Sequence, residues 1–515
     1  MSAQRPPADI CLLLEGTYPY VSGGVSSWVH DIIRGLPELT FQIVALLPNR
    51  TRRDIVYQLP ENVVGVENVY LQDLPRGWPW LPRLKPFLRA TEHYLQNIMQ
   101  RGSLDDLRGL VELFAPARRR LGAEILLNSH ATWEMLLNLY RSSQSRSPFL
   151  EFFYTWRALI GGLYAVLLAE LPPARAYHAV STGYAGALMA RAAIETGRPG
   201  IVTEHGIYTN ERRIEITMAD WIYDTPYASF SVDDVPRNLK DMWKDVFGTY
   251  SIACYQAARE ILTIFTGNQK FQRSDGADPA KMRVIPNGVD VERIAGIERA
   301  AGARRPTVAL IGRVVPIKDI KTFIRACALL QQQILELEAL IIGPFDEDKE
   351  YAAECREYVR QSGLESTVTF TGKVNILDYL GRIDVVVLTS ISEGQPLVML
   401  EAGAAGIPLV ATDVGACREI IAGREDERPA LGPGGVVTTL TSPKATAEGM
   451  LKLLGDPVFY ASCSAAIRER VRRYYDKREM LAAYRELYER LIEAPDTAQA
   501  GERKRRRAWP ASASR

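Results

Sequence analysis

The chain of 515 residues lacks an apolar run long enough to span a membrane. Its longest such run, ALIGGLYAVLLA at residues 158–169, is closed by Glu170, whereas a spanning helix needs about 20 apolar residues. The opening MSAQRPPADI also lacks the apolar core of a secretory signal. We therefore expect a buried helix at 158–169 and a cytoplasmic protein, with peripheral docking at the inner membrane left open.

Paired cysteines and a surplus of one charge are absent as well. The six cysteines are scattered without a CxxC pair, so we expect neither a disulfide framework nor a zinc site, and a reducing cytosol fits. Lysine and arginine number 62 and aspartate and glutamate 61, giving a formal net charge of +1. Without a concentrated basic face, no nucleic-acid partner is expected.

One charge run stands out near the end of the chain. Residues 503–507 are all basic and lie among small and polar residues. We predict that 496–515 is a disordered basic tail. Two interpretations stay open: a solvated tail without function, and a tail with affinity for an acidic surface or anionic lipid.

Short, continuous apolar runs dominate the remainder and alternate with segments of helical period. The first set lies at 10–16, 41–48, 174–181, 200–206 and 260–266, and the second at 307–313, 337–344, 367–374, 383–390 and 408–415. Continuous apolar strands between helices indicate a parallel sheet covered on both faces. Two sets therefore predict an α/β protein with two doubly wound, Rossmann-like domains.

The predicted domain boundary lies at the turn-forming segment VIPNGVD, residues 284–290. We assign 1–285 to an N-terminal domain, in which about 72–170 is a helical insertion, and 286–475 to a C-terminal domain. A final helix over 476–495 is expected to return to the N-terminal domain.

Two cations follow the first strand of the second domain. This strand ends at Gly312, and Arg313 and Lys318 come before a helix starting near Asp319. Because open α/β sheets bind ligands beyond the carboxyl ends of their strands, both cations suit a diphosphate. An ordinary surface loop often holds such residues too, so the pair alone leaves both interpretations open.

A second strand end carries two carboxylates in the sequence SEGQPLVMLEAGAAG. Glu393 lies in the loop, Pro396 suits the first turn of a helix, and Glu401 lies further along that helix. A carboxylate placed like Glu401 can accept hydrogen bonds from ribose hydroxyls, and the first amides of the helix would face an anion. Two solvated glutamates are the alternative, but their neighbours are almost all apolar or small.

Candidates in the first domain lie in its first 205 residues, which contain all five histidines. His178 and His205 fall at or near strand ends, where a histidine is more often structural than chemical. His205 is the better candidate because Gly206 opens its turn. The Gly23–Gly24 pair follows another strand and opens a helix, a weak signal by itself.

In this order, these segments resemble the retaining family 4 glycosyltransferases of the GT-B fold, in which two Rossmann-like domains face each other across a cleft. The resemblance covers about residues 10–491 and is weakest over 72–170. Its most specific element is E-x7-E, here Glu393 and Glu401, beside GR…K and IPNGVD. The stretches EGTYPYVSGGVSSWV and TEHGIYTNERRIEI resemble more narrowly the cytosolic glycosyltransferases of Pel exopolysaccharide synthesis, which function in biofilms.

The resemblance implies a role for each matching position. It makes Arg313, Lys318, Glu393 and His205 catalytic. Gly23, Gly24, Gly312, Val374, Gly394, Gln395, Pro396, Leu397 and Glu401 join Arg313, Lys318 and Glu393 in donor binding. Glu401 would bind the ribose, Glu393 the sugar, and main chain near 372–374 the uracil. Many relatives carry HxH where this chain has His178 and Val180, so no catalytic role is carried over to His178.

The function that the resemblance implies is transfer of a hexose from a UDP-sugar, UDP-glucose first, to a growing polysaccharide. The anomeric configuration would be retained by front-face attack, without a metal or cofactor, and inner-membrane export subunits are possible partners. Two alternatives stay open: a cytosolic glycogen- or sucrose-type synthase, and a non-catalytic nucleotide-sugar-binding scaffold of an export complex.

Overall fold

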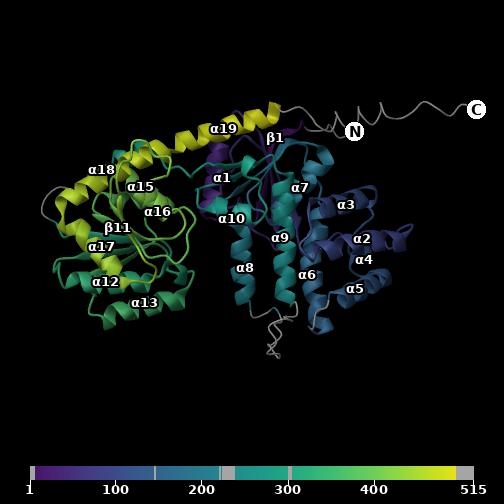
Figure 1. Cartoon of the computed structure of the whole chain (residues 1–515), viewed down its shortest axis with the longest axis horizontal. Coiled ribbons are helices and arrows are strands. Elements are labelled where there is room, and N and C mark those ends of the chain that lie inside the picture. The colour runs from purple at the N-terminus through teal and green to yellow at the C-terminus, as the bar shows by residue number, and fades with distance from the viewer. Residues whose placement is uncertain (1–5, 144–146, 220–221, 223–237, 300–303, 494–515) are drawn as a thin grey trace, which may run out of the picture. The chain divides into compact units, whose positions relative to one another are not determined.

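The computed structural model describes residues 6–143, 147–219, 222, 238–299 and 304–493. The predicted basic tail at 496–515 lies outside the described residues. The chain forms two compact units (Figure 1). The first comprises Met1–Thr263, Gln269–Arg283 and Tyr484–Arg515, and the second Ile264–Asn268 and Val284–Ala483.

A seven-stranded sheet in the order β3-β2-β1-β4-β5-β6-β7 forms the centre of the first unit. Its strands are β1 (Ala8–Glu15), β2 (Phe41–Leu47), β3 (Val63–Tyr70), β4 (Ala174–Ala179), β5 (Gly200–Glu204), β6 (Glu260–Thr263) and β7 (Met282–Val284). From β3 through β6 each neighbouring pair is parallel. The strand order reverses between β1 and β4, which places the topological switch point there.

The helices of the first unit pack around this sheet, and some of them also pack against one another. They are α1 (Gly24–Gly35), α2 (Leu84–Ile98), α3 (Leu104–Phe114), α4 (Ala123–Leu126), α5 (His130–Ser142), α6 (Phe149–Leu168), α7 (Tyr184–Thr196), α8 (Tyr208–Met218), α9 (Leu239–Ala257) and α10 (Asn268–Ser274). Figure 1 shows α2–α6 gathered together. The apolar run at 158–169 lies in α6 and its C-terminal cap residue Ala169, and α6 is buried along most of its length, as predicted.

A six-stranded sheet in the order β10-β9-β8-β11-β12-β13 forms the centre of the second unit. The strands are β8 (Thr307–Ile311), β9 (Glu338–Ile342), β10 (Val368–Gly372), β11 (Val385–Leu388), β12 (Leu409–Thr412) and β13 (Gly435–Thr438). The helices are α11 (Val291–Ala295), α12 (Ile320–Gln331), α13 (Lys349–Gln361), α14 (Leu377–Leu380), α15 (Leu397–Ala404), α16 (Cys417–Ala422), α17 (Pro443–Gly455) and α18 (Pro457–Tyr474). Its switch point lies between β8 and β11.

The strands of the second sheet contribute side chains to two separate cores, one on each face. Ala309 and Val386 pack in one core, whereas their chain neighbours Val308 and Val385 pack in the other. Because successive side chains of a strand point to opposite faces, a strand buried on both faces must be apolar throughout. This explains the continuous apolar runs of the sequence.

The structure adds strands that the pattern did not predict. β3 carries Glu67 and Asn68 at the edge of its sheet, and most of its residues are only partly buried or exposed. β7 has three residues and β13 four, too few for a periodic signal. The helix predicted at the end of the chain is α19 (Lys477–Glu493). Its residues from Tyr484 onward belong to the first unit. Among the described residues, no helix is both long and apolar enough to cross a bilayer.

Candidate active site

The loops that follow β8 and β11 place a lysine against a glutamate at the switch point of the second unit. Nζ of Lys318 lies 2.5 Å from Oε1 of Glu393. The two side chains are only 16% and 12% exposed. Removing one member of such a pair leaves an uncompensated charge in a poorly hydrated place, so each group stabilises the charge of the other.

The loop that carries Glu393 is fixed by its neighbours. The amide of Ala416 donates to the carbonyl of Gly394 at 2.8 Å. A Cβ on Gly415, whose φ is +52°, would overlap that same carbonyl oxygen, so only glycine fits this approach. On another side, the amide of Asn287 donates to Oε1 of Gln395 at 2.7 Å. The loop is therefore shaped before any ligand arrives.

Gln395 and Asn287 are both buried, yet each keeps one unused polar atom. Among the described residues, Nε2 of Gln395 and Oδ1 of Asn287 are buried without a hydrogen-bond partner. An unpaired buried polar group is costly, so such atoms often mark a place where a ligand or water belongs. Gln395 therefore shapes the loop, and its donor-binding role stays a prediction.

Arg313 lies apart from the Lys318–Glu393 pair. Its Nη1 donates to both carboxylate oxygens of Glu347, at 2.6 and 2.8 Å. Both side chains are more than half exposed. The structure thus brings Lys318 and Glu393 together, but directs Arg313 to a surface carboxylate in the loop after β9.

Glu401 lies on α15, which begins at Leu397, and Pro396 is the cap residue just before it. The sequence placed Pro396 inside the first turn; it lies one position earlier. Burial raises the pKa of Glu401 to about 7, because a carboxylate loses hydration among its neighbours. Near neutral pH both protonation states of Glu401 are populated, and hydrogen bonds from hydroxyl groups would stabilise its ionised form.

Gly312 and Val374 follow two strand ends of the second sheet. A Cβ on Gly312 would lie 3.4 Å from Cε of Lys318, so the lysine stem passes over this glycine. Val374 is partly buried against the core that contains Ala309 and Val386. The carbonyl of Gly372 already accepts a hydrogen bond from the amide of Gly343 at 3.0 Å. The hydroxyl of Thr371 also donates to this carbonyl, at 3.1 Å, so both of its acceptor positions are in use. Main-chain binding of the uracil near 372–374 stays a prediction.

In the first unit, His205 follows β5 and packs against Trp28 of α1. The two rings meet edge to face, with centroids 4.6 Å apart. Burial lowers the pKa of His205 to about 4, so the imidazole is neutral at pH 7. Its Nε2 is buried without a partner among the described residues, which leaves one ring nitrogen available to a ligand.

His178 has the opposite character. Its Nδ1 lies 2.8 Å from the Tyr488 hydroxyl, and its Nε2 lies 2.8 Å from Oγ1 of Thr203. Burial, with a smaller contribution from His205, lowers the pKa of His178 to about 3. Tyr488 lies on α19, so this histidine joins the C-terminal helix to the sheet, and both of its ring nitrogens are occupied.

The Gly23–Gly24 pair stands at the start of α1. Gly23 is the cap residue, and its φ of 172° is extended backbone. Space around both glycines is open, with nothing within 4 Å of a Cβ built on either. The loop could therefore approach a ligand closely, and Trp28 follows one turn later on the same helix.

Sequence reasoning missed Trp28, Gly415 and the structural role of Gln395. Gly415 is the last residue of the predicted run at 408–415, so the rule that located Glu393 could also have found it. Trp28 lies in an amphipathic helix, where an aromatic residue reads as ordinary core.

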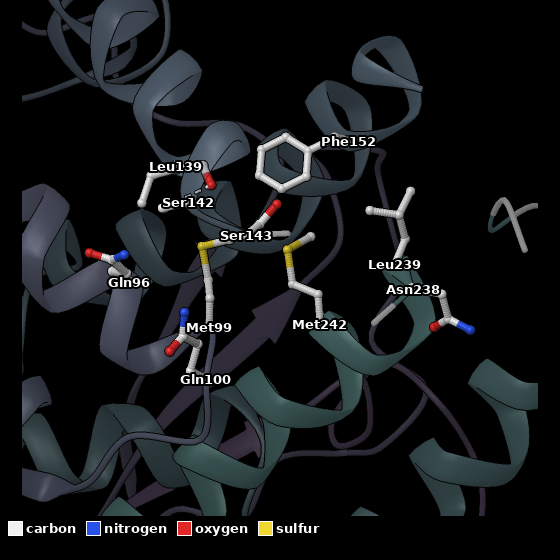
Figure 2. Close-up of a pocket in the computed structure, with 10 residues that line it drawn as sticks. All are labelled: Gln96, Met99, Gln100, Leu139, Ser142, Ser143, Phe152, Asn238, Leu239 and Met242. Carbon is white, nitrogen blue, oxygen red and sulfur yellow. Dashed lines mark hydrogen bonds between the residues drawn. The ribbon is translucent and has the colours of Figure 1, made fainter. Parts of the chain in front are cut away.

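A cavity within the helices of the first unit is unrelated to these residues. It lies between α2, α5, α6 and α9 and holds about 40 Å³ (Figure 2). Met99, Met242 and Phe152 surround it, together with Ser143. Room of this size suits about one or two water molecules and is far too small for a nucleotide sugar.

Two family profiles match the chain. The one described as "Domain of unknown function (DUF3492)" matches residues 8–280. The one described as "Glycosyl transferases group 1" matches residues 305–456, which include Lys318, Glu393 and Glu401. The second match therefore covers the loops of the candidate site in the second unit.

Curated relatives resemble part of the chain. D-inositol 3-phosphate glycosyltransferase of Kribbella flavida is 32% identical over 175 residues, which cover 31% of this chain and 39% of that protein. Putative glycosyltransferase EpsF of Bacillus subtilis is 29% identical over 143 residues, covering 26% and 36%. The chain thus spans less than half the length of these relatives.

Solved structures resemble nearly the whole chain. Sucrose-phosphate synthase from Thermosynechococcus elongatus has a TM-score of 0.56 at 17% identity, covering 94% of this chain and 100% of that one. Anabaena HepE in complex with UDP has a TM-score of 0.57 at 15% identity, covering 93% and 98%. These likenesses establish the GT-B fold.

Proposed function

Because the chain belongs to the family described as "Domain of unknown function (DUF3492)" and carries a group 1 glycosyltransferase domain at 305–456, we propose that it is a retaining glycosyltransferase. It moves a hexose from a UDP-sugar to a growing exopolysaccharide, with UDP-glucose as the first candidate donor. The observation that carries this proposal is the Lys318–Glu393 pair at the switch point of the second sheet.

The pair suits a nucleotide sugar because it separates an anion site from a hydroxyl site. A donor diphosphate competes with Glu393 for Lys318, and the released carboxylate can then accept hydrogen bonds from the sugar. Glu401, eight positions along, takes the ribose hydroxyls. His205, neutral and with one free ring nitrogen, keeps its proposed role toward the sugar.

The leaving group decides the chemistry. Lys318 stabilises the negative charge that grows on the departing diphosphate. Arg313 contributes to this stabilisation once its guanidinium has separated from Glu347. The acceptor hydroxyl attacks from the face that the diphosphate leaves, and a phosphate oxygen takes its proton. In this mechanism these two cations compensate the negative charge of the diphosphate, and no nucleophilic carboxylate is required.

The finer assignment rests on two N-terminal stretches. EGTYPYVSGGVSSWV and TEHGIYTNERRIEI resemble PelF, the glycosyltransferase of Pel exopolysaccharide synthesis. Anabaena HepE, similar in fold, has been solved in complex with UDP and with UDP-glucose, which supports the choice of a uridine nucleotide. We propose a polysaccharide acceptor and inner-membrane export subunits as partners on the strength of the Pel resemblance.

The test is nucleotide release measured with UDP-, GDP- and ADP-glucose as donors, with and without an exopolysaccharide acceptor. We expect release of UDP alone, stimulated by the acceptor and reduced in Lys318→Ala. Release of GDP or ADP in place of UDP would overturn the donor. Tight binding of UDP without turnover on any acceptor would instead favour a nucleotide-sugar-binding scaffold.

A further inference from the structure

Thr389 connects the two loops of the candidate site from a buried position. It directly follows β11 and is 1% exposed. Its hydroxyl donates to the carbonyl oxygens of both Lys318 and Asp319, each at 3.0 Å. One proton is thus shared between two consecutive carbonyls of a loop about seventy residues earlier in the chain.

The backbone that Thr389 holds is in an unfavourable conformation. Pro316–Lys318 form a 3₁₀ turn, and Asp319 then has φ 44° and ψ 53°, in the left-handed region. A non-glycine residue stays in this region only where its surroundings hold it. Oδ1 of Asp319 accepts from the amide of Thr322 at 3.3 Å, which fixes one side of the turn. Thr389 fixes the other.

A second hydrogen bond joins the same two segments. The amide of Ile391 donates to the carbonyl of Ile317 at 2.8 Å. Residues 389–391 therefore hold residues 317–319 as a block, and Glu393 follows two residues later. The Lys318 side chain passes over Gly312 and reaches Glu393, so its course starts from the backbone that Thr389 fixes.

We propose that Thr389 is a positioning residue for Lys318. Its hydroxyl holds the Lys318–Asp319 peptide so that the ammonium group points at the place where the diphosphate binds. Thr389 itself touches neither donor nor acceptor. This inference rests on the proposed function for its ligand, a nucleoside diphosphate, but its geometric part can be tested without that ligand.

Three variants separate positioning from ordinary packing. Thr389→Val keeps the shape and removes the hydroxyl, whereas Thr389→Ser keeps the hydroxyl and removes a methyl. Thr307→Val is the matched control: Thr307 is 2% exposed, and its hydroxyl donates to the carbonyl of Arg305 at 3.0 Å, at the start of β8. That end of the strand is opposite to the candidate site.

The first measurement is the acylation rate of individual lysines in the full-length chain, followed by mass spectrometry. The side chain of Lys318 is 16% exposed and that of Lys321, on α12, is 33% exposed. We expect Thr389→Val to raise the labelling rate of Lys318 at least about fivefold with Lys321 unchanged, and Thr389→Ser and Thr307→Val to stay within about twofold of wild type. An unchanged rate in Thr389→Val overturns the inference.

The second measurement is the Kd of UDP by calorimetry. We expect Thr389→Val to weaken UDP binding by about fivefold, as loss of one hydrogen bond does, and to have no further effect in a Lys318→Ala background. An equal loss in that background would mean that Thr389 acts independently of Lys318 and would overturn the inference. If wild type binds no UDP while Lys318 labelling responds as expected, the proposed function fails and the positioning role stands.

Discussion

The two sheets present different chemistry at corresponding places. At the switch point of the second unit, Lys318 and Glu393 come from the loops after β8 and β11 and form a charged pair, and backbone hydrogen bonds fix both loops. At the carboxyl ends of the first sheet, His205 and Trp28 form a neutral, aromatic contact. The same α/β architecture therefore carries a charged pair in one unit and a neutral, aromatic contact in the other, and the residues that follow the strands make the difference.

The role of the charged pair is tested by removing its lysine. Lys318→Ala should lower kcat/KM for the UDP-sugar by at least about 10-fold, because one charge-assisted contact to the leaving diphosphate is lost. Steady-state kinetics of UDP release measure it. Lys321→Ala, which removes a lysine paired with Glu354 at 2.6 Å on the next helix, is the control and should change little. Equal kinetics in both variants would remove Lys318 from the site.

The neutral side is tested by replacing the two histidines in turn. His205→Ala should lower kcat by about 5- to 10-fold, the worth of one hydrogen bond of ~1–1.5 kcal/mol in the transition state. His178→Ala should lower kcat less and Tm more, because it leaves the Tyr488 and Thr203 hydroxyls without their histidine partner. Kinetics and thermal unfolding of both variants decide this, and a reversed order on kcat would mean that His178 is the functional histidine.

Arg313 is the second cation to be tested in the second unit. Arg313→Ala should lower kcat/KM by less than Lys318→Ala does, roughly two- to fivefold, because its guanidinium must first leave Glu347 and is more than half exposed. Raising the salt concentration should reduce the difference in kcat/KM between wild type and Arg313→Ala, because salt screens an exposed charge. A loss as large as that of Lys318→Ala would show that the two cations act as one clamp.

Glu401 provides a test of the pH dependence of stability. Glu401 has its folded pKa raised from 4.5 to about 7, so its neutral form stabilises the fold fully below pH 4.5, and this stability is lost as the pH rises through about 7. Glu401→Gln should therefore gain Tm relative to wild type as the pH rises from about 5 to about 8. Thermal unfolding across this pH range measures the Tm of both proteins. A constant Tm difference between wild type and Glu401→Gln would contradict the raised pKa.

The fold could be predicted because strands buried on both faces need continuous apolar residues, and these stand out in the sequence. β3 was not predicted, because this edge strand contains Glu67 and Asn68 and has no continuous apolar run. Strand ends predicted that Lys318 and Glu393 each follow a strand of the second domain, but the adjacency of β8 and β11 that brings them together comes from the structure. Their ion pair, and the contact of Arg313 with a surface glutamate, depend on side-chain rotamers, which no sequence pattern specifies. Thr389 reads in the sequence as the polar end of a buried strand.

We expect the Lys318–Glu393 pair to open and receive a nucleoside diphosphate. A crystal structure of the chain with UDP tests this expectation. It should show the β-phosphate within hydrogen-bond distance of the Lys318 ammonium group, with Glu393 released and the ribose hydroxyls on Glu401. An intact Lys318–Glu393 pair with UDP bound elsewhere would contradict it.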